Sequence, residues 1–287
     1  MRAEPELIRL SLERRYGVGL TGEERPCPEG QKIVFWPSEL PESRAVSLEV
    51  LVGWRSLDVT ASGGAYSREF VAAMGRAELG QRESFRGFLR TVQGRSGAVQ
   101  LSLNGNMVSF ESDDLWDQTW ERLSIQISRH PFSVMGNSSK QVADAVIPWI
   151  SLALGSVLSL VPLEAEDENA RREGAIKEIL SKRYERDPIN RALCLEIHGS
   201  TCMACGFSFG DVYGEIGEGF IEVHHVDPLS SHKGIEQVIN PLTALVPLCC
   251  NCHAMAHRRN PPYRVDELRS LMPRLGKAEI TTNCQST

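Results

Sequence analysis

The sequence predicts an α+β protein built from two domains. The first part of the chain mixes helical and strand-like apolar periodicity, an acidic run then interrupts the pattern, and most histidines and cysteines follow that run. At 287 residues the chain has room for two cores of ordinary size. We therefore expect a mixed α/β domain of unassigned fold over residues 1–163, a helical linker over 164–183 and a second domain over 184–287.

Each element expected in the first domain has its own local signal. Helices are predicted where a serine or charged residue opens an apolar segment and a glycine closes it, at residues 6–17, 67–80 and 82–94. Strands are predicted where apolar residues nearly alternate, at residues 32–36, 45–54 and 120–128. Residues 98–110 predict a hairpin, because Asn104 and Gly105 supply the positive φ angles of a type I′ turn.

Residues 145–163 form an apolar span without charge that approaches the length of a membrane crossing. Two prolines, a glycine and three serines interrupt the span, and the residues before it begin like an amphipathic helix. We expect a buried helix of a globular domain. A membrane segment and a homodimer interface remain as alternatives for this span.

Charge and the start of the chain narrow the class of protein. The net charge is −6, and neither side of Leu180 is broadly basic, which excludes a protein that coats DNA through many phosphate contacts. A local basic patch or a bound cation is still compatible with DNA binding. Residues 1–15 lack a secretory apolar region, so we expect a cytoplasmic protein whose cysteines favour metal over disulfides.

The second domain contains two C-x-x-C pairs separated by 43 residues, Cys202 with Cys205 and Cys249 with Cys252. A two-residue gap turns the backbone back on itself, so two such pairs can converge on one tetrahedral zinc ion. We predict a structural Zn²⁺ site from these four thiolates. Cys250 is adjacent to a ligand and is expected to be a spare thiol.

Histidines cluster between and after the cysteine pairs. His224 and His225 follow an expected strand at 220–223 and would start on opposite sides of it. His253 and His257 are four residues apart, which places both rings on one face of a helix, as in a zinc or transition-metal site. Asn240 precedes a second expected strand at 241–248, and a helix over 188–199 precedes the whole arrangement.

The order of these motifs resembles the HNH (ββα-metal) endonuclease family. The matching residues are C-x-x-C, then EVHH-x-x-P-L-S, then N-x-x-x-L-x-P-L-C-x-x-C-H and a final histidine, over about 184–272. The cysteine frame and the preceding helix look like McrA-type 5-methylcytosine-specific restriction endonucleases. One departure is Cys250, where this subset commonly has proline. The resemblance implies a zinc-stapled ββα-metal domain at the C-terminal end of the chain.

The resemblance also implies roles for the side chains. His225 would be the general base, with Asn240 holding the loop that orients it. His224, His253 and His257 would bind a catalytic divalent metal, Mg²⁺, Mn²⁺ or another transition metal. Two further residues, Arg258 and Arg259, follow His257 and are expected either to contact the DNA backbone or to be solvated at the helix end.

A nuclease domain of this kind contacts mainly backbone, so specificity is expected to come from residues 1–163. Base flipping needs flat stacking surfaces, and the candidates for a modified-base pocket are Phe35, Trp36 and Trp54. Aromatic residues near strand ends are also common core residues. The first domain could instead sense a phage protein or a nucleotide.

The sequence thus favours a modification-dependent restriction or defence endonuclease that acts on double-stranded DNA. Two alternatives remain: a zinc-framed nucleic-acid-binding module without cleavage, and a non-specific HNH nuclease directed by a partner. Cleavage of both strands by a single-metal site would favour a homodimer.

Overall fold

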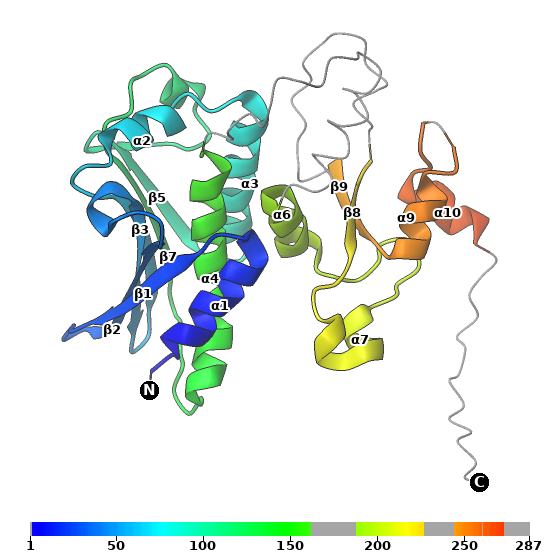
Figure 1. Cartoon of the computed structure of the whole chain (residues 1–287), viewed down its shortest axis with the longest axis horizontal. Coiled ribbons are helices and arrows are strands. Elements are labelled where there is room, and N and C mark those ends of the chain that lie inside the picture. The colour runs from blue at the N-terminus through cyan, green and yellow to red at the C-terminus, as the bar shows by residue number, and fades with distance from the viewer. Residues whose placement is uncertain (1, 162–187, 227–243, 260, 273–287) are drawn as a thin grey trace.

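The computed structural model of the chain describes residues 2–161, 188–226, 244–259 and 261–272. Within these ranges a seven-stranded antiparallel sheet with its helices comes first, and a smaller unit around a two-stranded hairpin follows (Figure 1). The predicted α+β class is confirmed. The linker expected at 164–183 and Asn240 lie outside the described residues.

The large sheet has the strand order β1-β2-β3-β4-β7-β5-β6. Its strands are β1 (Leu20–Arg25), β2 (Gly30–Pro37), β3 (Val46–Gly53), β4 (Leu57–Gly63), β5 (Ala98–Leu103), β6 (Asn106–Val108) and β7 (Leu123–Arg129). The predicted hairpin is confirmed, with φ of 54° at Asn104 and 88° at Gly105 between β5 and β6. Short 3-10 turns occur at Glu42–Arg44 and Asp113–Trp116.

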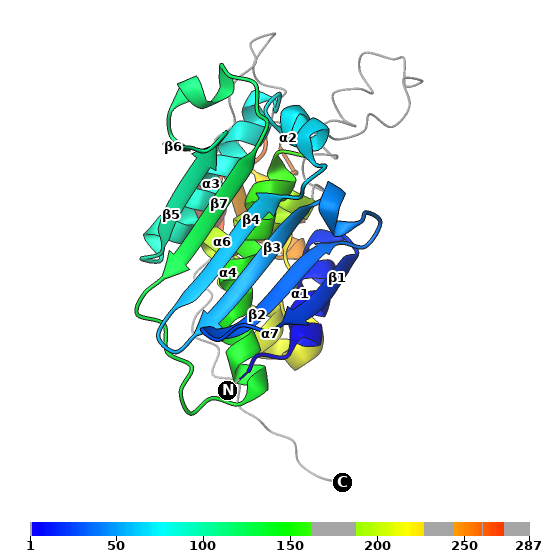
Figure 2. The same cartoon turned by 90° about the vertical axis from the view of Figure 1, so that its left-hand side faces the viewer.

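Helices cover one face of this sheet and leave the other open (Figure 2). The helices of this part are α1 (Pro5–Tyr16), α2 (Arg68–Met74), α3 (Leu79–Gly94) and α4 (Ser139–Ser159). On the open face, cross-strand rows are polar, as in the row formed by Glu49, Thr60, Gln126 and Gln100. An antiparallel sheet with one wet face needs this alternation of apolar and polar side chains.

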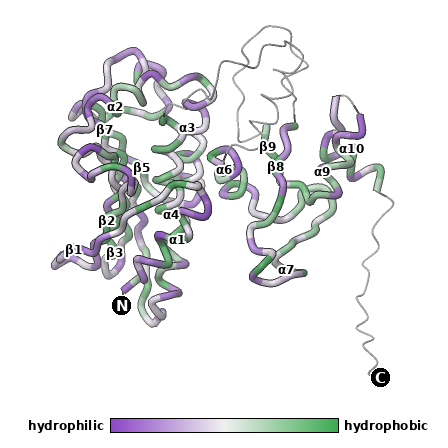
Figure 3. The backbone as a smooth tube through the Cα atoms, viewed as in Figure 1, coloured by the Kyte–Doolittle hydropathy of each residue, from purple (hydrophilic) through white to green (hydrophobic). Residues whose placement is uncertain are grey.

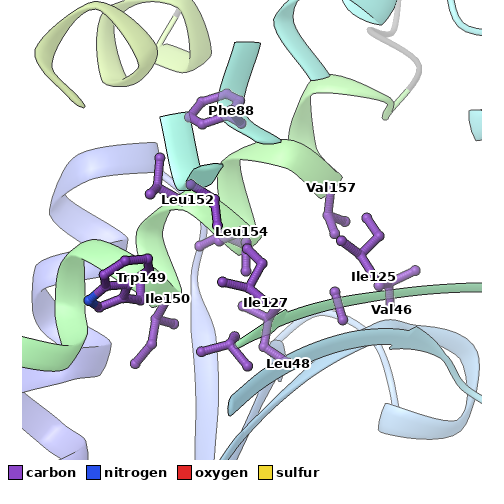
Figure 4. Close-up of a cluster of buried hydrophobic side chains, with 14 of the residues drawn as sticks. Val46, Leu48, Phe88, Ile125, Ile127, Trp149, Ile150, Leu152, Leu154 and Val157 are labelled. Carbon is purple, nitrogen blue, oxygen red and sulfur yellow. The ribbon is translucent and has the colours of Figure 1, made fainter. Parts of the chain in front are cut away.

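Helix α4 is the centre of the core. Ser138 caps its N-terminus by accepting a hydrogen bond from the Gln141 N–H, and α4 then runs between the sheet and helices α1 and α3. Figure 4 shows α4 residues such as Ile150 and Val157 packed against Leu48 and Ile125 of the sheet. By length and composition α4 could cross a membrane, but 72% of its most apolar window is buried inside the protein. Residues 145–161, the described part of the apolar span, are therefore core and are not available as a dimer interface.

Gly155 of α4 marks the closest packing in this core. A Cβ atom there would lie 2.3 Å from Phe88 Cε1 and 2.6 Å from the Tyr16 hydroxyl oxygen. We expect Gly155→Ala to lower the free energy of unfolding of this domain by about 1–3 kcal/mol, because both rings are buried and must move. Urea unfolding measures this, with Gly94→Ala as the control, since nothing lies within 4 Å of that position. Equal stability of the two variants would contradict the packing.

Two strands and one helix boundary differ from the prediction. Strand β1 was not predicted because it is a polar edge strand in which only Leu20 is buried. Strand β4 carries small residues, whose apolar signal is weak. The helix predicted over 67–80 is interrupted, because Glu78 and Gln81 form a capping box that starts α3 after α2 has ended at Met74.

The three aromatic residues proposed for a base pocket do not come together. Phe35 is 0% exposed and faces the core, so no base can stack on it. Its neighbour Trp36 is half-buried on the opposite face of β2. Trp54, 80% exposed, follows the far end of β3, where Gly53 pairs with Gly30. The predicted pocket is therefore wrong as a set, because alternation and strand length separate its members.

The second part begins with α6 (Pro188–His198), which confirms the helix predicted at 188–199 apart from its last residue, Gly199. It continues through α7 (Phe209–Tyr213), the 3-10 turn Gly214–Gly217, β8 (Glu222–His225), β9 (Leu245–Leu248), α9 (Cys250–Ala256) and α10 (Val265–Leu271). Strands β8 and β9 form an antiparallel hairpin, and Figure 3 shows the polar end of β8 beside the apolar β9. Helix α6 also packs against α1, α3 and α4 of the first domain.

Candidate functional site

Four cysteines converge between the loop after α6 and the start of α9. Their sulfur atoms all lie within 4.8 Å of one another, and Cys205 Sγ is 3.7 Å from Cys249 Sγ. Thiolates bound to tetrahedral zinc at ~2.3 Å lie roughly 3.8 Å apart, so the group fits Zn²⁺. The other two members of the group are Cys202 and Cys252.

Backbone geometry holds this cysteine group in place. The Gly206 N–H donates to the Cys202 carbonyl oxygen at 2.9 Å, which closes the turn of the first pair. Met203 N–H donates to the Pro247 carbonyl oxygen at 2.9 Å and ties that turn to β9. The second pair lies at the N-terminal end of α9, with Cys249 as its N-cap residue. The loop after α6 and the start of α9 therefore meet at the four sulfurs.

Thiol chemistry in the group also points to a cation. Burial opposes ionisation of Cys202, but N–H groups of Cys205, Cys249 and Ala204 donate to its sulfur, and its pKa is lowered. Burial raises the pKa of Cys252, and its neighbour Cys249 adds to the rise. Only a bound cation stabilises four adjacent thiolates together.

Among the described residues, three other cysteines lie outside the group: Cys27, Cys194 and Cys250. Burial raises the pKa of Cys194 to about 12, so this α6 residue stays a neutral core thiol. Cys250 is the first residue of α9, and its thiol hydrogen-bonds with Glu222. Cys250 is thus adjacent to the four-cysteine group but is not one of its members.

Three histidines form a second cluster on the β8–β9–α9 unit. His224 comes from β8, His253 lies in α9, and His257 is the C-cap residue of α9. Their candidate ligand nitrogens all lie within 4.8 Å of one another, and His253 Nε2 is 3.2 Å from His257 Nε2. Ring centroids are 4.8–5.2 Å apart. Metal–imidazole bonds of ~2.1 Å place nitrogens roughly 3.0–3.4 Å apart, so the cluster fits one ion.

His225 does not belong to this cluster. It pairs with Leu245 of β9, is 7% exposed, and follows His224 directly, so strand alternation places it on the other side of β8. Val223, on the same side as His225, packs against Cys194 and Leu245. The two adjacent histidines are therefore held in different surroundings, as the sequence predicted.

Glu222 is a site residue that we did not predict from the sequence. Its carboxylate contacts His253 Nδ1, which leaves Nε2 of that ring pointing at His257. A carboxylate in this position fixes the tautomer and orientation of a metal-binding imidazole. The signal was present, because Glu222 is two residues before His224 and strand alternation puts both on one face.

Glu222→Gln is expected to weaken metal binding by about 10–100-fold, because an amide orients His253 less well than a carboxylate does. The measurement is calorimetric titration of the full chain with Mn²⁺ after the four cysteines have been loaded with zinc. Glu218→Gln is the matched control, since Glu218 is an exposed carboxylate near the same hairpin. Unchanged affinity in Glu222→Gln would remove the orienting role.

The two arginines after His257 have different surroundings. Arg259 donates to both carboxylate oxygens of Glu267 at 2.8 and 2.7 Å, and its guanidinium lies 4.1 Å from the centroid of the Tyr263 ring. Arg258 is exposed and makes no side-chain hydrogen bond or ion pair with the described residues. Arg259 therefore ties α9 to α10, while Arg258 is the one available to a ligand.

Comparisons with known proteins agree with this geometry. Residues 202–259 match the HNH endonuclease family, and the matched stretch includes both cysteine pairs and the three clustered histidines. A stretch of 80 residues is 40% identical to the type IV methyl-directed restriction enzyme EcoKMcrA of Escherichia coli (strain K12). That stretch is 28% of this chain and 27% of the relative, so the chain matches about a quarter of that protein. The resemblance to cysteine-framed HNH domains is confirmed.

Proposed function

We propose that this chain, whose residues 202–259 form an HNH endonuclease domain, is a metal-dependent endonuclease that hydrolyses phosphodiester bonds of double-stranded DNA. The observation that carries the proposal is the cluster of His224, His253 and His257 inside a complete four-cysteine frame. A module that only bound DNA would need the frame but not three convergent imidazoles. We further propose that cleavage depends on base modification, because the relative EcoKMcrA is a methyl-directed restriction enzyme.

The donor set indicates which catalytic metal the site would take. Within the described residues, the cluster consists of three imidazole nitrogens, without a carboxylate among its members. Mg²⁺ prefers oxygen ligands and octahedral water, whereas imidazole suits Fe²⁺, Ni²⁺ and Zn²⁺. Mn²⁺ also prefers oxygen ligands but accepts imidazole more readily than Mg²⁺ does. We propose a transition metal for this cluster and structural Zn²⁺ for the four cysteines. Thiolate ligation of zinc also supports a reducing cytoplasm as the location.

Each site residue has a separate task in the proposed hydrolysis. His225 takes the proton from the attacking water as general base, which a neutral imidazole does well near neutral pH. The metal, when bound, supplies the positive charge that stabilises the leaving 3′ oxygen. Glu222 orients His253, and the proposed task of Asn240 is to hold the loop that positions His225. The products would carry 5′-phosphate and 3′-hydroxyl ends.

Arg258 is proposed to contact a backbone phosphate. Arg258→Ala is expected to weaken DNA binding and to reduce the slope of log K against log salt by about 0.9, the value of one phosphate contact. Fluorescence anisotropy at several salt concentrations measures this. Arg259→Ala is the matched control, because its guanidinium is already paired with Glu267. A larger change in salt slope for Arg259→Ala would reverse the assignment.

Specificity is proposed to lie in residues 2–161. The part of the chain after α6, called the nuclease unit from here on, is expected to contact mainly the DNA backbone. This first domain has an open polar sheet face and exposed aromatic residues, but no single base pocket follows from Phe35, Trp36 and Trp54. Cutting both strands with one metal cluster requires two copies or two successive events. Helix α4 is buried and cannot be the contact between two copies.

The experiment that tests the proposal is cleavage of matched unmodified, 5-methylcytosine and phosphorothioate duplexes by zinc-loaded protein with Mn²⁺ or Mg²⁺. We expect cutting of one modified substrate with Mn²⁺, and loss of cutting in His224→Ala. Cutting of all three duplexes would support a nuclease without modification dependence. Folded wild type that binds DNA but cuts nothing would sink the catalytic proposal and leave a binding module.

A further inference from the structure

Helix α6 has two buried faces that belong to different parts of the molecule. Ala192 and Leu193 are buried in the core of the first domain. Cys194, one residue later, packs against Val223 of β8 and Leu245 of β9. Figure 1 shows α6 lying between helices α3 and α4 on one side and the β8–β9 hairpin on the other. The helix is therefore shared between the sheet domain and the nuclease unit.

Glu196 is the centre of a polar network on the first of these faces. Its side chain is 4% exposed and forms ion pairs with Arg15 of α1 and with Arg95, whose Nη1 lies 2.9 Å from Oε2. Ser151 of α4 donates to Glu196 Oε1 at 3.2 Å. Arg95 also donates to the Glu196 carbonyl oxygen, so both the side chain and the backbone of α6 are held.

The charges of this network hold α6 against the first domain. A buried carboxylate is costly unless cations and hydrogen bonds surround it, and here all of them come from the first domain. Burial lowers the pKa of Arg95, and repulsion from Arg15 lowers it further. Both arginine side chains are about a third exposed, so the buried carboxylate of Glu196 depends on them more than they depend on it.

A glycine in α3 allows the close approach of the two helices. A Cβ atom at Gly87 would lie 3.2 Å from Leu193 Cδ2, tighter than ordinary van der Waals contact. Glycine inside a helix costs about 1 kcal/mol relative to alanine, so its use at a buried helix contact indicates that space is needed there. Ser84, one helical turn earlier, donates to Asn190 Oδ1 at 3.3 Å.

The opposite face of α6 leads directly to the catalytic strand. Arg191 donates to the Gly219 carbonyl oxygen at 2.8 Å, just before β8. Val223, which packs on Cys194, is adjacent to His224, and Leu245 pairs with His225. Any displacement of α6 would therefore be passed to the strand that carries both histidines.

We propose that α6 fixes the nuclease hairpin at a set position relative to the first domain, with Glu196 as the positioning residue. The inference rests on the proposed function, because it implies that the cut phosphodiester bond lies at a constant offset from the DNA feature held by residues 2–161. Glu196 does not touch substrate. It acts through α6 on the placement of His224 and His225.

The test measures domain placement and cut position in the same full-length, zinc-loaded protein. Spin labels on unnatural amino acids at Met107 of β6 and Leu271 of α10, both exposed, report the distance between the two parts. Two variants loosen the junction from opposite sides, Glu196→Gln and Gly87→Leu. Their matched controls are Glu42→Gln, which removes a carboxylate paired with Arg25 away from α6, and Gly94→Leu, at an α3 position where a Cβ atom would meet nothing within 4 Å. Circular dichroism and zinc content verify that each variant is folded.

Wild type and controls are expected to give one narrow distance distribution and one cut position. Both junction variants should lose the narrow distribution and cut at several neighbouring bonds, while the cleavage rate at saturating DNA is retained. A broad distribution in wild type, or unchanged distances and cut positions in both junction variants, would overturn the inference. If wild type cuts no DNA, the proposed function fails, and the distances alone decide whether the junction is rigid.

Discussion

His225→Ala is expected to reduce DNA cleavage by about 10²–10⁴-fold, the usual contribution of a general base. His225 is buried on β8 and lies outside the cluster of three histidines, so its loss should leave metal binding intact. His224→Ala should differ, because it removes a proposed metal ligand and lowers both cleavage and Mn²⁺ affinity. Comparison of these two variants therefore distinguishes the general base from a metal ligand.

The measurement combines single-turnover cleavage with Mn²⁺ titration and DNA-binding anisotropy for each variant. His130→Ala is the matched control, since it removes an exposed imidazole from the first domain. The expected pattern for His225→Ala is lost cleavage with normal metal and DNA binding. If this variant cleaves at the wild-type rate, the general base is another group. If it loses Mn²⁺, His225 is a ligand and the assignment of roles is reversed.

Cys249→Ala is expected to unfold the nuclease unit while the first domain stays folded. Structural zinc contributes roughly 10–16 kcal/mol to the folding of small zinc domains, and one missing thiolate removes a large share of it. The apolar cluster around these cysteines is small, with Ile221, Leu248 and Leu268 among its buried members. The first domain has its own extensive core around α4 and does not depend on the metal.

Zinc content by mass spectrometry and limited proteolysis test this prediction. We expect loss of bound zinc and rapid proteolysis after residue 199, with a protected fragment that contains residues 2–161. Cys250→Ser is the matched control, because Cys250 is adjacent to the frame but is not one of its four members. Loss of zinc in Cys250→Ser would place this cysteine among the ligands. Full zinc in Cys249→Ala would exclude the proposed frame.

The parts of the fold that could be predicted have strong local signals. The type I′ turn at Asn104 and Gly105 follows from the backbone freedom of two residues, and α4 follows from a long uncharged run that comes after an amphipathic helix start. The two-residue gap in each cysteine pair predicts the turn that lets the four sulfurs converge. Strands β1 and β4 lack such signals, because an edge strand needs few apolar residues and a tightly packed strand uses small ones.

The candidate site was predicted where it consists of metal-binding types and missed where it depends on contacts. His253 and His257 were identified from spacing, His224 was added by the resemblance to HNH endonucleases, and the nitrogens of all three do converge. Glu222 lies on the same face of its strand as His224, but only the packing of α9 against β8 shows its contact with His253. Glu196 could not have been identified at all, because its partner Arg15 is far away in the chain and each looks like an ordinary surface charge. Long-range pairing is invisible to local patterns.

The connectivity of the large sheet has a consequence for how the protein is made. Strands β4 and β7 are neighbours although residues 64–122 separate them, so this seam closes a long loop and forms late compared with the β1–β4 meander. Every helix that receives α6 comes earlier in the chain than α6 itself. During synthesis the docking surface can therefore be complete before Cys249 and Cys252 leave the ribosome. We expect the nuclease unit to be assembled on a first domain that has already folded, so that the catalytic strand acquires its position as it forms.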